Sequence, residues 1–250
     1  MVQLVIPMAG LGSRFSSMGY KPPKPLLPLM GRTMIEVVVE NLMARQTSSV
    51  TLVASPDHRN ILEDIRKSLE GLALGAGEAS LQIHYLTELS QGPADSVRQC
   101  LGLLDKSVPM IVANSDQYVV GGIEELYSHL LKDSESNGLL VLEDSDPKWS
   151  FARLDEDNFV LEVREKQAIS NWATAGIYGF SNPRVFNQAL DSMDAANDRT
   201  NGELYVGPTY NYLAEKTKAF HLGSNQDKFF GLGTPGDYEL FRSRFETNHP

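Results

Sequence analysis

Residues 3–28 read "QLVIPMAGLGSRFSSMGYKPPKPLLP", an apolar run followed by a loop that contains glycine, arginine and lysine. Apolar runs of the same kind return in "VTLVAS" from Val50, "LQIHYL" from Leu81 and "PMIVAN" from Pro109. Helical patterns separate these runs, and this alternation is typical of βαβ units. The sequence therefore predicts an α/β fold with a Rossmann-like, mostly parallel sheet flanked by helices and a smaller mixed lobe.

The loop after the first run combines several groups that bind phosphate. Gly10 and Gly12 carry no side chains, so backbone N–H groups there can approach an anion closely, and Ser13 offers a further donor. Arg14 adds a planar guanidinium that can bind phosphate through two hydrogen bonds. Lys24 lies between two prolines, which stiffen the backbone that carries its positive charge. We predict that this loop forms a cradle for a triphosphate.

Two other phosphate-binding loops do not fit this stretch. A Walker A loop ends in Gly-Lys-Ser/Thr, and the dinucleotide fingerprint has a third glycine where this chain has Phe15. The combination of Arg14 with the "PKP" around Lys24 is also more specific than an ordinary turn between a strand and a helix.

The pattern of predicted strands and helices changes near Gly138. Before it, the clearest helix is predicted from Thr33, which can form a capping box with Glu36. After it, shorter strands alternate with helical pieces, one from Pro183 and one near 203–215. We predict one domain, residues 1–250, with three parts: a nucleotide-binding part (about 1–136), an acceptor-binding lobe (about 137–232) and a closing helix (233–250).

Composition restricts the classes of function. The chain has 250 residues and a formal net charge of -10, which argues against nucleic-acid binding, because that binding depends on basic side chains. The single cysteine, Cys100, lies in an apolar run and is predicted to be buried in a reducing compartment. The sequence has no signal-peptide pattern and no apolar run long enough to span a bilayer, so we expect a cytoplasmic protein without a membrane partner.

The string "GSRF…GY…PKPLLPL…MIE" resembles the nucleotidyltransferase superfamily of sugar-phosphate pyrophosphorylases. It is most similar to the short branch found among capsule-biosynthesis proteins. The resemblance implies a nucleotide-binding parallel sheet and an acceptor-binding lobe, and it extends in weaker form over most of the chain. Arg14 and Lys24 are then the expected catalytic residues.

A carboxylate follows the fourth predicted strand. Asp116 comes where ligands of open α/β sheets bind, and a magnesium ion that bridges phosphates needs such a ligand. The resemblance likewise implies Mg²⁺ as the cofactor, bound at this position. The alternative is that Asp116 caps a following helix.

The remaining candidate positions depend mainly on the resemblance. A turn in "LSQGPADSV" matches the segment that contacts the nucleobase, but Pro93 replaces the usual threonine-type residue. Each candidate segment also has a structural alternative. Gln91 and Gly92 could form a plain turn, Lys166 could be a solvated lysine, and Thr174 and Gly176 could belong to a tightly packed strand of small residues. The candidate nucleotide-binding residues are Ala9, Gly10, Gly12, Ser13, Gln91 and Gly92, and the candidate acceptor-binding residues are Glu165, Lys166, Thr174, Gly176 and Glu203.

One position departs from the pattern of the superfamily. Many relatives have an aspartate, a second metal ligand, two residues before the glycine of Gly-Thr-Pro, where this chain has Gly231. A second metal is therefore left open, with Asp237 as a possible replacement.

The predicted reaction transfers a nucleoside monophosphate from a nucleoside triphosphate, with CTP or UTP favoured, to a phosphorylated acceptor such as a sugar 1-phosphate. One alternative is a cytidylyltransferase that acts on a phosphorylated amine or amide. A second alternative is a glycosyltransferase that uses the Asp144-Ser145-Asp146 motif, and a third is a noncatalytic ligand sensor. We expect a monomer or a homodimer.

Overall fold

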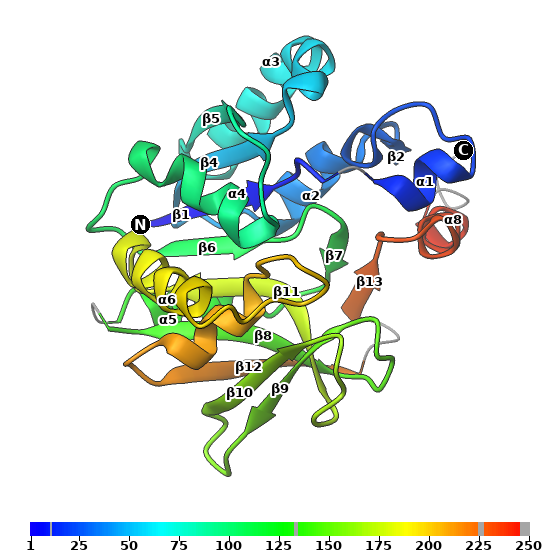
Figure 1. Ribbon diagram of the computed structural model, residues 1–250. Coiled ribbons are helices and arrows are strands. Elements are labelled where there is room, and N and C mark those ends of the chain that lie inside the picture. Colours follow the sequence, from blue (N-terminus) through cyan, green and yellow to red (C-terminus); the bar gives the residue numbers. More distant parts are fainter. Residues whose placement is uncertain (11, 133–134, 225–227, 246–250) are drawn as a thin grey trace.

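The computed structural model of the protein describes residues 1–10, 12–132, 135–224 and 228–245 (Figure 1). The strands are β1 (Val2–Pro7), β2 (Pro28–Leu29), β3 (Arg32–Thr33), β4 (Thr47–Ala54), β5 (Ser80–Tyr85), β6 (Met110–Ala113), β7 (Gln117–Val119), β8 (Asn137–Glu143), β9 (Ser150–Leu154), β10 (Val160–Glu165), β11 (Trp172–Phe180), β12 (Thr217–Ser224) and β13 (Phe229–Gly231). The α-helices are α1 (Ser13–Ser17), α2 (Met34–Leu42), α3 (Arg59–Gly77), α4 (Pro93–Cys100), α5 (Ile123–Leu130), α6 (Pro183–Ala195) and α8 (Pro235–Phe245).

Strand β1 lies near the middle of a nine-stranded sheet. Its side chains alternate between two cores, with Leu4 and Ile6 in one and Val5 in the other, because both faces of the sheet are covered by helices. Strands β5, β4, β1 and β6 are adjacent and parallel. The carboxyl ends of β1 and β6 therefore lie side by side, which brings the loop after β1 close to the residues after β6.

The second half of the chain continues the same sheet. Strand β11 pairs antiparallel with β6 and also contacts β8 and β9, and β12 and β10 extend the sheet further. The predicted α/β fold class is confirmed, and its parallel part is the half that carries β1. The strands predicted for the smaller mixed lobe pair directly with this half, as Figure 1 shows along β11.

Two layers of helices cover the sheet. Helix α2 begins as predicted, since Thr33 N donates to Glu36 Oε2 at 2.8 Å in a capping box. Residues of α2, α3, α5 and α8 contribute to one core, and residues of α4 and α6 contribute to the other. The closing helix is observed as α8, while residues 246–250 lie outside the described part of the chain.

The helical piece predicted near 203–215 is corrected by the structure. Only Gly207–Tyr212 is helical, and it is a 3-10 helix. Tyr210 donates hydrogen bonds to the carbonyl oxygens of Gly138 and Gly179, and the amide of Asn211 pairs with both backbone groups of Val163. These contacts tie the segment to neighbouring strands, so it does not continue as a free-standing helix.

Two further expectations concern burial and the membrane. Cys100 is buried, and burial raises the pKa of its thiol to about 12. In the described ranges, no helix combines the length and apolar character needed to cross a bilayer.

Candidate active site

An ion pair joins the loop after β1 to the residues after β6. Lys24 Nζ lies 2.7 Å from Asp116 Oδ2, and both side chains keep some solvent exposure, 19% and 25%. Lys24 starts a short 3-10 helix between Pro23 and Pro25, so its backbone is held on both sides. The structure therefore brings together two of the residues predicted from distant parts of the sequence.

The glycine loop lies directly against this lysine. Gly12 has φ +57° and starts α1, and a Cβ placed there would lie 3.2 Å from the Cβ of Lys24. The backbone N–H groups of Gly10 and Gly12 donate to no other described residue, so they are available to donate to an anionic ligand. Arg14 is exposed, and its guanidinium makes no hydrogen bond or ion pair with another part of the described chain. The loop thus offers N–H donors beside the ion pair, and Arg14 follows them in the chain as an exposed cation.

Asp116 does not cap a helix, because strand β7 follows it. Its backbone oxygen accepts a hydrogen bond from Leu232 N at 2.7 Å, and a Cβ at Gly233 would lie 2.9 Å from its Oδ2. The described residues contain no cluster of three side chains able to hold a metal ion. Asp116 would hold Mg²⁺ together with substrate phosphates and water, since Mg²⁺ is commonly bound through one or two carboxylates in this way.

A second polar cluster lies at the end of β10. Lys166 Nζ donates to Tyr205 Oη at 2.7 Å and lies 3.7 Å from Glu165 Oε1. Tyr205 donates in turn to Glu203 Oε2 at 2.6 Å. Burial raises the pKa of Glu165, whereas the hydrogen bond from Ser150 and the charge of Lys166 act to lower it. The predicted acceptor residues Glu165, Lys166 and Glu203 are therefore one connected group.

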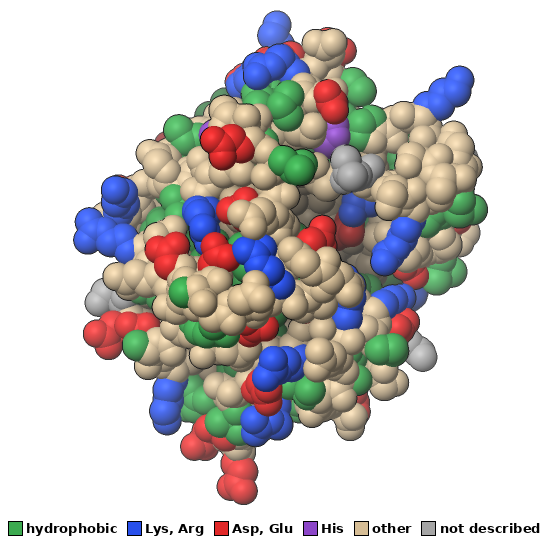
Figure 2. Space-filling model, viewed as in Figure 1, with side chains coloured by type: hydrophobic (Ala, Val, Ile, Leu, Met, Phe, Trp, Pro, Cys, Tyr) green, Lys and Arg blue, Asp and Glu red, His purple; other side chains and the backbone are tan. Residues whose placement is uncertain are grey.

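An electrostatic interaction and two backbone hydrogen bonds link this cluster to the nucleotide loops. The charge of Arg14 acts on the Tyr205 hydroxyl, where it opposes the larger effects of burial and of Glu203, which raise the pKa of Tyr205. Leu204 N donates to Gln91 O at 2.8 Å, and Ala94 N donates to Leu204 O at 3.0 Å. Figure 2 shows this face hollowed to the right of its centre, with basic and acidic side chains around the hollow.

Gly176 and Thr174 support the site from β11. Gly176 has φ +68°, and its carbonyl oxygen accepts hydrogen bonds from Asn114 N at 2.9 Å and Gln117 Nε2 at 3.0 Å. Thr174 is 3% exposed, and its hydroxyl pairs with that of Tyr178 at 2.9 Å. Both residues therefore pack the strand beside Asp116, and Thr174 has its side chain turned to the interior.

Replacing Gly176 by alanine is expected to destabilise the protein by about 2 kcal/mol or more. A Cβ there would lie 2.3 Å from Gln117 Oε1 and 2.4 Å from Asn114 Nδ2, in a backbone conformation that favours glycine. Urea unfolding followed by circular dichroism measures the loss. Gly71→Ala, in α3 with open space around it, is the matched control and should leave stability unchanged or slightly raised. Equal stabilities for the two variants would contradict this packing.

The structure gives a steric reason for Gly231. A Cβ at this position would lie 2.7 Å from Trp149 Cη2, so Trp149 occupies the space that an aspartate side chain needs. Asp237, the alternative carboxylate, accepts a hydrogen bond from Thr234 Oγ1 at 2.7 Å in the first turn of α8. Its other oxygen lies 3.6 Å from Lys148 Nζ.

The Asp-Ser-Asp motif considered for a glycosyltransferase is bonded within its own loop. Asp144 Oδ2 accepts from Trp149 Nε1 at 3.0 Å, and Asp146 Oδ2 lies 3.3 Å from Lys148 Nζ. Neither contact brings the two carboxylates together on one cation.

Sequence reasoning missed Tyr205 and the role of Trp149 beside Gly231. Tyr205 lies two residues after Glu203 in "GELYVGPTY", but nothing in that string indicates that its hydroxyl meets Lys166 from another strand.

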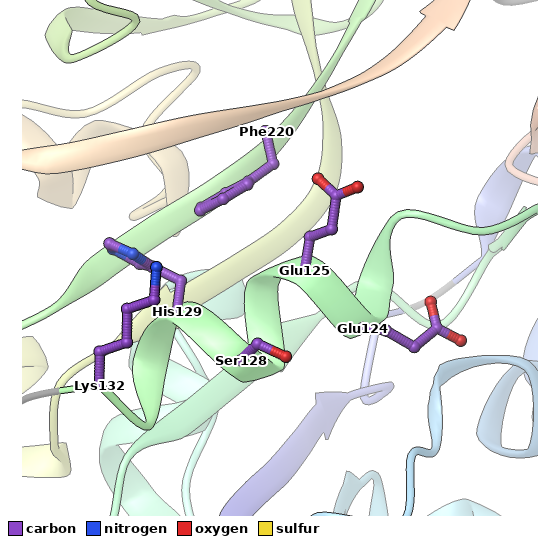
Figure 3. Close-up of a pocket in the computed structure, with 6 residues that line it drawn as sticks. All are labelled: Glu124, Glu125, Ser128, His129, Lys132 and Phe220. Carbon is purple, nitrogen blue, oxygen red and sulfur yellow. The ribbon is translucent and has the colours of Figure 1, made fainter.

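A shallow depression elsewhere on the surface does not belong to this site. Figure 3 shows it between α5 and β12, and its lining residues are Glu124, Glu125, Ser128, His129, Lys132 and Phe220. Its two glutamates would repel a triphosphate. It shares no residue with the clusters around Lys24 and Lys166.

Fold and site together define a Rossmann-like α/β protein with a charged cleft at the carboxyl ends of its parallel strands. A family model described as Nucleotidyl transferase matches residues 4–226. The chain belongs to this family.

Relatives and solved structures agree with this assignment. The chain is 24% identical over 247 residues to D-glycero-alpha-D-manno-heptose 1-phosphate guanylyltransferase of Campylobacter jejuni, covering 96% of this chain and 98% of the relative. A nucleoside-diphosphate-sugar pyrophosphorylase from Vibrio cholerae RC9 matches with a TM-score of 0.79 and 24% identity, over 95% of this chain and 98% of that one. The inositol-1-phosphate CTP transferase from T. maritima matches with a TM-score of 0.71 and 18% identity, over 96% and 94%.

Proposed function

We propose that the protein transfers a nucleoside monophosphate from a nucleoside triphosphate to a sugar 1-phosphate, giving a nucleoside-diphosphate sugar and pyrophosphate. The observation that carries this proposal is the 2.7 Å pair between Lys24 and Asp116, beside a glycine loop with open N–H groups. Such an arrangement would place a cation and a metal-binding carboxylate around one polyphosphate. By its resemblance, the product would serve capsule polysaccharide synthesis in the cytoplasm.

The residues of the chain would position the substrates and balance their charge. An oxygen of the acceptor phosphate attacks the α-phosphorus, and the bond to the β-phosphate oxygen breaks as pyrophosphate leaves. Arg14 and the loop amides would hold the triphosphate, Lys24 would stabilise the α-phosphate in the transition state, and Lys166 would hold the acceptor phosphate. Asp116 would bind Mg²⁺, which supplies charge neutralisation of the phosphates when bound.

The nucleobase would lie against the turn of Gln91 and Gly92. This turn is tied to Leu204 by backbone hydrogen bonds, so the base and the acceptor would lie on adjoining segments. CTP and UTP are our favoured donors. The likeness to the inositol-1-phosphate CTP transferase supports, as a second candidate, cytidylyl transfer to an acceptor that is not a sugar.

A pyrophosphate-release screen tests the proposal. It crosses CTP, UTP, GTP and ATP with sugar 1-phosphates, inositol phosphate and small phosphorylated amines. We expect one donor and acceptor pair to release pyrophosphate. The second product should be a nucleoside diphosphate joined to the acceptor through a phosphoanhydride bond. We also expect chelation with EDTA to reduce turnover to background and excess Mg²⁺ to restore it.

The arms of this screen separate the candidates. Activity with phosphorylated amines alone would show that the acceptor is not a sugar, and the second candidate function would then replace the first. Release of nucleoside diphosphate from a sugar nucleotide would identify a glycosyltransferase. Binding of nucleotide with no turnover in any combination would identify a sensor, and full activity in EDTA would remove the metal from the proposal.

A further inference from the structure

Lys166 has an unusual backbone conformation for its residue type. Its φ is +55°, in the left-handed region that lysine rarely adopts, directly after the end of β10. Lys166 N donates to Trp149 O at 3.0 Å, which holds the turn in this conformation. Strained backbone of this kind persists when neighbouring contacts fix it, and it often aims a functional side chain.

Tyr205 receives the side chain that this turn aims. Lys166 Nζ donates to Tyr205 Oη at 2.7 Å and lies 4.6 Å from the centre of the Tyr205 ring. The hydroxyl donates its own proton to Glu203 Oε2 at 2.6 Å. Tyr205 therefore lies between an ammonium group and a carboxylate. Its hydroxyl group accepts a hydrogen bond from the first and donates one to the second.

The backbone around Tyr205 is fixed by the nucleotide side of the cleft. Leu204 pairs with Gln91 and Ala94 through its N–H and carbonyl groups. A Cβ at Gly92 would lie 2.6 Å from Leu204 O, so the two segments are in close contact. Because Leu204 is held on both sides, the position of the next side chain is determined by the fold.

Two cations and two carboxylates surround the hydroxyl, and the cations keep donors for a phosphate ligand. Arg14 acts electrostatically on Tyr205 and has no partner among the described residues, and the ammonium of Lys166 is one-third exposed. An incoming phosphate monoester could accept from both cations without displacing Tyr205 from Lys166, since an ammonium group has three donors.

We propose that Tyr205 is a positioning residue that holds the Lys166 ammonium for the phosphate of the acceptor, with its own place fixed by the backbone hydrogen bonds of Leu204 to the nucleotide turn. This inference rests on the proposed function and deepens it. Tyr205 acts through Lys166, and its hydroxyl need not touch the reacting atoms.

A double-mutant cycle tests the inference with the donor and acceptor pair identified by the screen. We expect Tyr205→Phe to raise KM for the acceptor about tenfold, because it removes a charge-assisted hydrogen bond, and to leave KM for the nucleotide within about twofold. Lys166→Met should be more severe. In the Lys166→Met background, Tyr205→Phe should have no further effect, because the group through which it acts is gone.

Tyr212→Phe is the matched control. Its hydroxyl also donates to a carboxylate, Asp198 Oδ2 at 3.0 Å, but has no lysine partner in the described ranges, so acceptor KM should stay at the wild-type value. Additive effects of the Tyr205 and Lys166 changes, or an unchanged acceptor KM in Tyr205→Phe, would overturn the inference.

Binding of methyl phosphate, followed by ³¹P NMR, separates this inference from the reaction itself, since it requires no turnover. If no substrate pair releases pyrophosphate but methyl phosphate binds with the same pattern across the four proteins of the cycle, the proposed function fails and the role of Tyr205 stands. If turnover occurs but the cycle is additive, only the role of Tyr205 fails.

Discussion

Lys24→Ala is expected to lower kcat/KM for pyrophosphate release by about a thousandfold, because it removes the cation that faces the α-phosphate in a partly buried cleft. The fold should remain, since the side chain is 19% exposed and its main polar contact is with Asp116. Initial rates, together with circular dichroism and thermal unfolding, measure both effects.

The same substitution is expected to strengthen the binding of a metal ion, although it weakens catalysis. In the free protein the ammonium of Lys24 neutralises Asp116, so a metal ion has to displace it. Lys24→Ala should therefore bind Mn²⁺ more tightly than the wild type when no nucleotide is present, which calorimetry measures. Lys21→Ala, in the same loop and exposed, is the control for both results. Near-normal turnover in Lys24→Ala with intact circular dichroism would refute the role of the lysine.

Asp116→Asn is expected to reduce turnover by about two to three orders of magnitude, because an amide keeps the size of the side chain but loses the charge that binds the metal. The contact with Gly233 and the hydrogen bond from Leu232 N to the backbone oxygen should persist, so stability should change little. Activity measured against Mg²⁺ concentration should show a raised half-saturation point.

Asp146→Asn provides the control that also separates two reaction classes. Asp146 belongs to the Asp-Ser-Asp motif and lies beside Lys148, so a glycosyltransferase that used this motif would lose activity. Our account predicts wild-type rates for Asp146→Asn. The reverse pattern, with Asp146→Asn inactive and Asp116→Asn active, would contradict it.

Local signals predicted much of the fold because their causes are local. The capping box of Thr33 and Glu36 is contained in four residues. The parallel strands followed from apolar runs buried on both faces. The segment 203–215 was predicted less well, because its conformation depends on Asn211 and Tyr210 bonding to strands that are distant in sequence.

The candidate site also combines residues that local motifs predict with residues whose role depends on contacts distant in sequence. Lys24, Asp116 and the glycine loop could be proposed from motifs, and the order of β1 and β6 in the sheet then brings them together. Tyr205 could not, since its meaning depends on Lys166, 39 residues away in sequence. The glycine at 231 had no local explanation either, because its reason is the ring of Trp149, which is distant in sequence and packs against it.

The central claim is that Lys24, Arg14 and the metal on Asp116 hold one polyphosphate. A crystal structure with Mg²⁺ and a nonhydrolysable nucleoside triphosphate analogue tests it most directly. We expect the Lys24–Asp116 pair to open, with Lys24 Nζ on an α-phosphate oxygen, the metal on Asp116, and Arg14 on the outer phosphates. A nucleotide bound away from this cleft, with the Lys24–Asp116 pair unchanged, would contradict the account.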